Sequence, residues 1–126
     1  MARLADILAN ISERAGESLS IEQLIQLWSR FVNEVEAGYT LGAYDYVEEL
    51  FISDYLQEII EQSDASSSQH VSSTVRPHDE RFRFATVDSS RPFIAPANTQ
   101  GFWWFRVPRR LSVALEAELR SEGTIT

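Results

Sequence analysis

The sequence predicts an α+β fold, in which N-terminal helices pack on a small antiparallel sheet and a short helix follows at the C-terminal end. Two patterns support this class. Apolar residues recur at helical spacing through the first half of the chain. Aromatic residues in the second half alternate or run together, as is typical of strands. A length of 126 residues is that of one domain, 1–126.

Two helices are expected to begin the chain. Apolar residues three and four positions apart predict a helix over 2–15, and Gly16 is a natural stop. Ser20 and Gln23 are spaced as a capping box at the start of a second helix. Gly38 is expected to end that helix in a left-handed conformation, which residues with a Cβ atom resist.

Residues 39–63 are predicted to form one interrupted helix or two short ones. Ser53 followed by Asp54 resembles a new N-cap with an acid in the first turn, where it suits the helix dipole. Tyr44 and Tyr46 are two positions apart and cannot share one face of a helix. We therefore expect one of these tyrosines to be half-buried and the other exposed.

The middle of the chain changes composition. Residues 63–77 are rich in serine and poor in large apolar residues, which predicts a flexible loop. After it, Phe82 and Phe84 alternate with polar residues, which predicts a strand over 81–87. A helix over 78–86 is the alternative interpretation.

Four consecutive aromatic residues form the most distinctive stretch of the sequence. Wide rings favour a strand, and alternation would place Phe102 and Trp104 on one face and Trp103 and Phe105 on the other. Pro108 lacks a backbone N–H and should end that strand. Beyond it, leucines at a spacing of four predict a short C-terminal helix that ends before Gly123.

The predicted domain has three parts: an acidic helical part at 1–62, the serine-rich loop at 63–77, and an aromatic, arginine-bearing part at 78–126. Charge is distributed unevenly between them. The net charge is −8, and every basic residue except the two histidines is arginine. Residues 1–64 contain thirteen acids and three arginines, a net charge of −10. This distribution favours a basic protein partner, or only solubility, and disfavours nucleic acid.

Sequence motifs for catalysis, metals or membranes are absent. No cysteine is available for a disulfide or a thiolate nucleophile. The spacing of His70 and His78 matches no zinc pattern, so we expect no metal and no cofactor. The first apolar stretch contains Asp6 and does not resemble a signal peptide, and no apolar run is long enough for a membrane span. We therefore expect a cytoplasmic protein that does not bind membranes.

In size, acidity and lack of cysteine, the chain is similar to small bacterial immunity proteins and antitoxins. That resemblance implies a non-catalytic inhibitor that covers the active site of a basic toxin with acidic side chains. The acidic and aromatic residues of the second half of the helical part would form the contact. These partner-binding candidates are Tyr44, Asp45, Tyr46, Glu48, Glu49, Asp54, Glu58 and Glu61.

Two alternatives remain from the sequence. One is a small-ligand binder or enzyme with a pocket between the sheet and the helices. Its polar groups would come from Asp79, Arg83, Trp103 and Arg106, with Tyr46 beside them. The other is a structural subunit of a larger assembly. An exposed face at Trp103 would favour partner binding, and a deep polar pocket would favour the first alternative.

Overall fold

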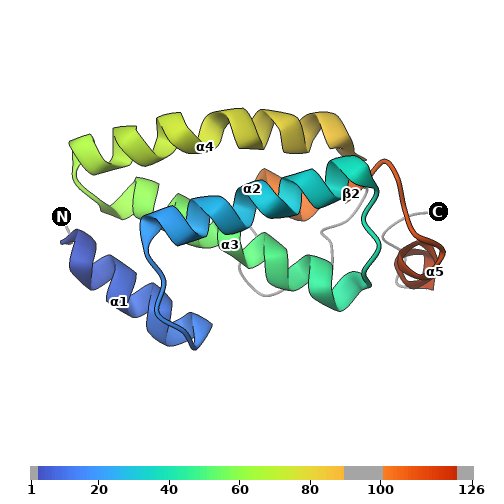
Figure 1. Ribbon diagram of the computed structural model, residues 1–126, viewed down its shortest axis with the longest axis horizontal. Helices are drawn as coiled ribbons and strands as arrows, with labels where there is room; N and C mark the ends of the chain where they lie inside the picture. The colour runs from blue at the N-terminus through green and yellow to red at the C-terminus, as the bar shows by residue number, and fades with distance from the viewer. Residues whose placement is uncertain (1–2, 90–100, 122–126) are drawn as a thin grey trace.

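The computed structural model describes residues 3–89 and 101–121, and these residues have the predicted α+β architecture. Five α-helices, one 3-10 helix and a two-stranded antiparallel sheet lie within these ranges (Figure 1). They are α1 (Leu4–Ala15), α2 (Ile21–Ala37), α3 (Ala43–Gln62), α4 (Ala65–Ala85), β1 (Thr86–Asp88), η1 (Phe102–Phe105), β2 (Arg106–Pro108) and α5 (Val113–Ser121).

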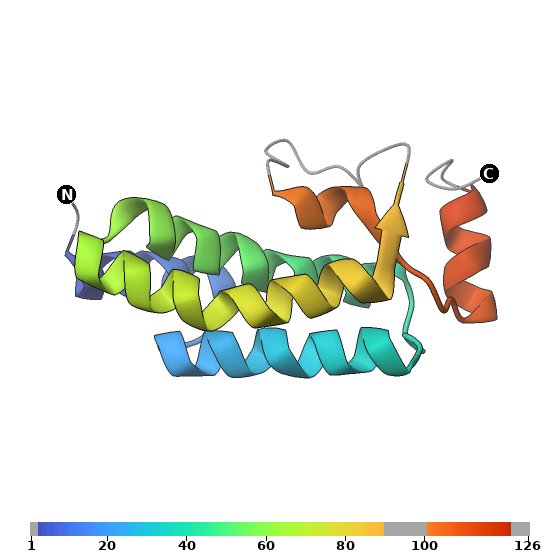
Figure 2. The ribbon, with the colours of Figure 1, turned by 90° about the horizontal axis from the view of Figure 1, so that it is seen from above.

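The helices α2, α3 and α4 pack against one another and enclose most of the core, and α1 packs on α3. Figure 2 shows η1 on the opposite side of α3 and α4 from α2, and α5 across one end of the bundle. Among the described residues, no helix is long and apolar enough to cross a membrane.

Both of the first two helices end at the predicted glycines and α2 begins at the predicted cap, whereas α1 begins at Leu4. Gly16 ends α1 with a positive φ of 77°. The Ser20 hydroxyl accepts from the Gln23 N–H at 3.2 Å, and the Gln23 carbonyl oxygen accepts from the Ser20 N–H at 2.8 Å, so the capping box is confirmed. Gly38 ends α2 with φ 106° and ψ 105°, a positive φ outside the left-handed helical region.

The third helix is continuous, so the predicted interruption is wrong. Ser53 is buried inside α3 and starts no new helix. The N-cap is Gly42, which has no side chain to accept a hydrogen bond. Glu118 of α5 supplies the acceptor instead, because its carboxylate accepts a hydrogen bond from the Ala43 N–H at 3.2 Å. A carboxylate at this position also suits the positive end of the helix dipole.

The serine-rich stretch predicted as a loop is the first half of α4. Asp64 caps the helix by accepting from the Ser67 N–H at 2.8 Å. Val71 and Val75, four positions apart, are buried against the neighbouring helices. The composition was misleading because two valines with one good cap suffice for a helix that packs on larger apolar surfaces.

The helix continues through Pro77 to Ala85, so the predicted strand over 81–87 is wrong and the helical alternative is correct. Phe82 is fully buried and Phe84 is 85% exposed. Positions two apart on a helix diverge, whereas in a strand these rings would share a face. Strand geometry begins only at β1, which contains three residues.

The aromatic stretch also departs from a simple strand. Its four aromatic residues form η1, and β2 follows in antiparallel register with β1, pairing Val87 with Val107. Trp103 and Trp104 are both buried, which a strand with one solvent face would not allow. The strand ends at Pro108, as predicted. The C-terminal helix is confirmed as α5, and Leu115 and Leu119 bury it against the bundle.

Candidate functional site

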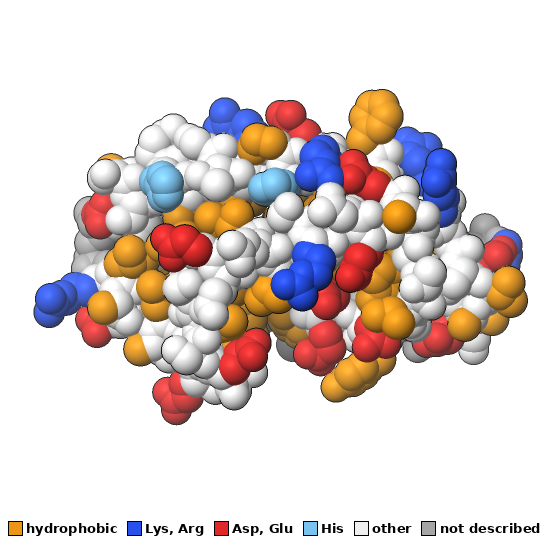
Figure 3. Space-filling view, in the orientation of Figure 1, with side chains coloured by type: hydrophobic (Ala, Val, Ile, Leu, Met, Phe, Trp, Pro, Cys, Tyr) orange, Lys and Arg blue, Asp and Glu red, His pale blue; other side chains and the backbone are white. Residues whose placement is uncertain are grey.

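Four carboxylates gather where α2 ends and α3 begins. The connection of residues 38–42 is short, so α2 and α3 are antiparallel neighbours, and Glu34 of α2 lies within electrostatic range of Glu49 of α3. We call Glu34, Asp45, Glu48 and Glu49 the acidic surface. Figure 3 shows acidic side chains over this region, with hydrophobic side chains among them.

Three carboxylates of the acidic surface, from both helices, lie within electrostatic range of the fourth, Glu49. The pKa of Glu49 is raised first by partial burial and then by the charge of Glu34, with smaller contributions from Asp45 and Glu48. Arg30 lowers the pKa of Glu49 and is the cation that opposes this effect. No hydrogen bond or ion pair joins these four carboxylates to another residue within 3–89 or 101–121. Their charges therefore face solvent largely uncompensated.

Other acids predicted to contact a partner are already bonded within the molecule. The carboxylate of Asp54 accepts from the indole N–H groups of Trp103 and Trp104 at 2.8 and 2.9 Å. Glu58 forms a bidentate ion pair with Arg14 of α1. Glu61 accepts from Gln57 one turn earlier at 3.1 Å. The structure thus separates these three acids from the acidic surface.

The two tyrosines of α3 differ sharply in exposure. Tyr44 is 75% exposed beside Asp45, and Leu41 just before the helix is 49% exposed. Tyr46 is fully buried, and its hydroxyl donates to the carbonyl oxygen of Arg106 at 3.0 Å. Tyr46 is therefore a core residue and no surface anchor, whereas Tyr44 and Leu41 offer exposed apolar area at the edge of the acidic surface.

A buried hydroxyl lies close to the same carboxylates. Tyr39, between α2 and α3, is 1% exposed, and its hydroxyl has no hydrogen-bond partner among the described residues. Burial raises the pKa of this hydroxyl, and so do the charges of Glu49, Asp45 and Glu34. The hydroxyl is thus within electrostatic range of acids from both helices.

The residues of the alternative ligand pocket have partners within the molecule, three of them through hydrogen bonds and Arg83 through an aromatic ring. Asp79 accepts from the indole N–H of Trp28 at 2.9 Å. The Arg83 guanidinium lies over the Phe102 ring, 3.6 Å from its centre. Trp103 is held by Asp54, so no face of its indole is offered to a partner.

Arg106 is the most heavily bonded of these residues. Its guanidinium donates to the Thr86 hydroxyl at 2.8 Å, to the carbonyl oxygens of Arg83 and Thr86 at 2.7 Å each, and to the Asp88 carboxylate at 2.6 Å. These bonds join the end of α4 to both strands. Arg106 therefore stabilises the sheet, and the polar groups of Asp79, Trp103 and Arg106 are used in internal hydrogen bonds.

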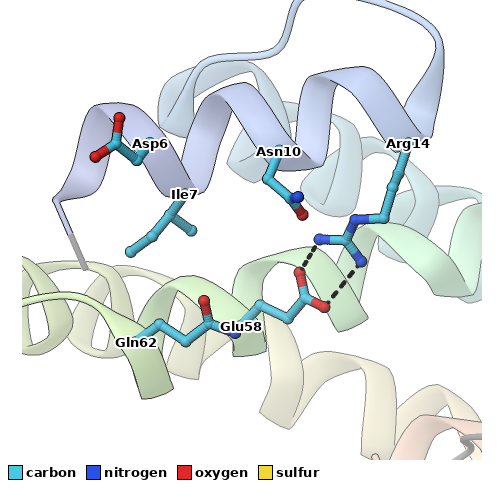
Figure 4. Close-up of a pocket in the computed structure, with 6 residues that line it drawn as sticks. All are labelled: Asp6, Ile7, Asn10, Arg14, Glu58 and Gln62. Carbon is cyan, nitrogen blue, oxygen red and sulfur yellow. Dashed lines mark hydrogen bonds and ion pairs between the residues drawn. The ribbon is translucent and has the colours of Figure 1, made fainter. Parts of the chain in front are cut away.

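A shallow groove lies elsewhere, between α1 and α3. It has a volume of about 220 Å³ and is lined by Asp6, Ile7, Asn10, Arg14, Glu58 and Gln62 (Figure 4). The Arg14 to Glu58 ion pair crosses it, so its strongest charges neutralise each other. This volume is below the usual range for a small-molecule site. Among the described residues, no three metal-ligating side chains are grouped closely enough to hold an ion.

Comparison with known proteins gives no assignment. The chain matches no protein-family model, and no curated protein or solved structure matches it.

Sequence reasoning missed two residues of this region, Glu34 and Tyr39. A usable signal was present for Glu34. The short connection between α2 and α3 requires antiparallel packing, which places the last turns of α2 beside the first turns of α3. No local pattern marks the hydroxyl of Tyr39, because its lack of a partner depends on the packed arrangement of both helices.

Proposed function

We propose that this protein is a non-catalytic binding module that docks a basic protein through its acidic surface. Most concretely, it would be an immunity- or antitoxin-type inhibitor of a basic toxin. The observation that carries the proposal is the group of four carboxylates without described partners, Glu34, Asp45, Glu48 and Glu49, beside the exposed Tyr44.

Physical reasons favour docking over a solvated surface with no role. Like charges held close together repel, which works against the folded state and is relieved when a cation approaches. Acidic patches accelerate encounters with basic partners, and an exposed tyrosine is a common energetic anchor at interfaces. A catalytic role has less support, because Asp79, Trp103 and Arg106 are hydrogen-bonded within the molecule and Arg83 lies over the Phe102 ring.

The test compares two triple variants with the same change in charge. Glu34→Gln, Asp45→Asn and Glu48→Gln together remove three charges of the acidic surface. Glu13→Gln, Glu17→Gln and Glu22→Gln remove three exposed charges near the end of α1 and the start of α2. Exposed charges contribute little to stability, so both variants should fold.

The partner is captured from lysate with immobilised wild type, identified by mass spectrometry and purified, and its association rate is measured at low and high salt. We expect the acidic-surface variant to associate at least about tenfold more slowly at low salt, and the control variant to change far less. High salt should remove most of the difference because it screens exposed charges. Equal rates for wild type and the acidic-surface variant would contradict the proposal.

A further inference from the structure

The hydroxyl of Tyr39 is unusual because it is buried and has no described partner. Nearly all buried side-chain polar groups in proteins have a hydrogen bond, and an unsatisfied one opposes folding. The ring packs edge-to-face against Phe31 and Tyr46, with centroid distances of 5.6 and 5.3 Å. A phenylalanine would make the same ring contacts, so packing does not explain why the chain has a hydroxyl here.

The charges around this hydroxyl indicate what it could bind. Acids from both helices act on it, namely Glu34 from α2 and Asp45 and Glu49 from α3. Arg30 lies within electrostatic range of Glu49, whereas the charges that shift the pKa of the hydroxyl are those of the three acids. These charges favour a cation at this position, and a cation with N–H groups can also donate to the phenol oxygen, which accepts hydrogen bonds.

We propose that the acidic surface binds an arginine side chain of the partner, whose guanidinium donates to the Tyr39 hydroxyl and to the carboxylates of Asp45 and Glu49. This inference rests on the proposed function and specifies the basic residue that the surface selects. A guanidinium has five N–H donors in a rigid planar fork and can reach several acceptors at once. An ammonium group is smaller and more strongly hydrated, and it fits this arrangement less well.

Access to the hydroxyl requires the groups that cover it to move. Its oxygen is covered in the free protein, and Glu49 beside it is half-buried. Rotamer changes of this kind are common when interfaces form, while the backbone stays in place. Binding would then remove two unfavourable features of the free protein, the unsatisfied hydroxyl and the repulsion among the carboxylates.

The experiment uses two synthetic probes, hexa-arginine and hexa-lysine with blocked ends, and the variant Tyr39→Phe. Calorimetric titration at low salt should show that wild type binds hexa-arginine more tightly than hexa-lysine. The variant should lose about tenfold in affinity for hexa-arginine, as expected for one hydrogen bond from a charged donor, and keep its affinity for hexa-lysine. The inference would be overturned if wild type bound both peptides with equal affinity. It would also be overturned if Tyr39→Phe kept the same preference for hexa-arginine as wild type.

Thermal unfolding checks that Tyr39→Phe folds. We expect its midpoint temperature to be no lower than that of wild type, because the substitution removes no hydrogen bond. A measurement on the unchanged chain gives an independent test. With tyrosine labelled at the ζ carbon, hexa-arginine should shift the Tyr39 resonance and hexa-lysine should leave it nearly in place. Equal shifts with both peptides would count against the arginine site.

Failure of this inference can be distinguished from failure of the proposed function. If both peptides bind wild type equally and the acidic-surface variant weakens both, the docking surface stands and its preference for arginine is refuted. If the acidic-surface variant binds both peptides as tightly as wild type does, the docking surface itself is refuted.

Discussion

The carboxylate of Asp79 is partly buried and accepts a hydrogen bond from one indole N–H. It accepts from Trp28, which is fully buried and packs against Phe31 and Phe82. Burial raises its pKa to about 6, and the indole N–H and Arg83 offset only part of that effect. The sequence cannot show that Asp79, fifty-one positions away, satisfies the indole N–H of Trp28.

The raised pKa of Asp79 predicts a specific pH dependence of stability. In the unfolded chain an aspartate has a pKa of about 3.9, so between about pH 4 and 6 the folded state binds more protons. Wild-type stability should therefore fall as pH rises through this window. Asp79→Asn keeps an oxygen for the indole and does not titrate, so its free energy of unfolding relative to wild type should rise by about 1–3 kcal/mol from pH 4 to pH 7.

Urea unfolding of both proteins at several pH values measures this difference. The comparison isolates Asp79, because other carboxyls with a raised pKa, such as Asp54 and Glu49, titrate alike in both proteins. A difference in the free energy of unfolding that stays constant from pH 4 to 7 would show that Asp79 titrates normally.

Among the secondary-structure elements, η1 is bonded to α3 through the side chain of Asp54. Both indole N–H groups of the tryptophan pair converge on its Oδ1 atom. Local signals could be recognised in the sequence, as with the capping box of α2, because both partners lie within one turn. The contact between Asp54 and η1 could not, because it joins residues about fifty positions apart.

Removal of this carboxylate should destabilise the protein strongly. Asp54→Ala leaves two part-buried indole donors without an acceptor, and we expect a loss of about 3 kcal/mol in the free energy of unfolding. Asp54→Asn retains Oδ1 and should cost about 1 kcal/mol or less. Urea unfolding followed by tryptophan fluorescence gives both values. Equal losses in the two variants would show that charge, and not the shared acceptor, holds η1.

The fourth helix shows where composition fails as a guide. A serine-rich stretch suggests a loop, yet Val71 and Val75 lie in the groove between α2 and α3. We expect Val71→Ala to lower the free energy of unfolding by about 2 kcal/mol, since it leaves a cavity. Ser73→Ala, on the exposed side, should change it by less than about 0.5 kcal/mol. If thermal and urea unfolding show no loss for Val71→Ala, the helix does not pack there.

For the whole molecule, periodicity correctly predicted the N-terminal helices, whereas the alternation over 81–87 predicted a strand where α4 continues, and the candidate surface was only partly predictable. Asp45, Glu48, Glu49 and Tyr44 lie together because they share the first turns of one helix. Tyr46, Asp54 and Glu58 do not belong to this surface, because burial and pairing are decided by the helices that pack on α3. One sequence shows which residues share a helix but not which face each neighbour covers.

Pro77 has a consequence for local opening of the fold. It lies within α4 and has no N–H, so the carbonyl of Ser73 lacks the usual donor one turn ahead. The hydrogen-bond ladder of the helix is therefore weakest at this point. Fewer backbone hydrogen bonds therefore join the serine-rich turns before Pro77 to the aromatic turns after it, and we expect the turns before Pro77 to unwind as a separate unit. Amide hydrogen exchange should then divide α4 in two, with faster exchange in the turns before Pro77.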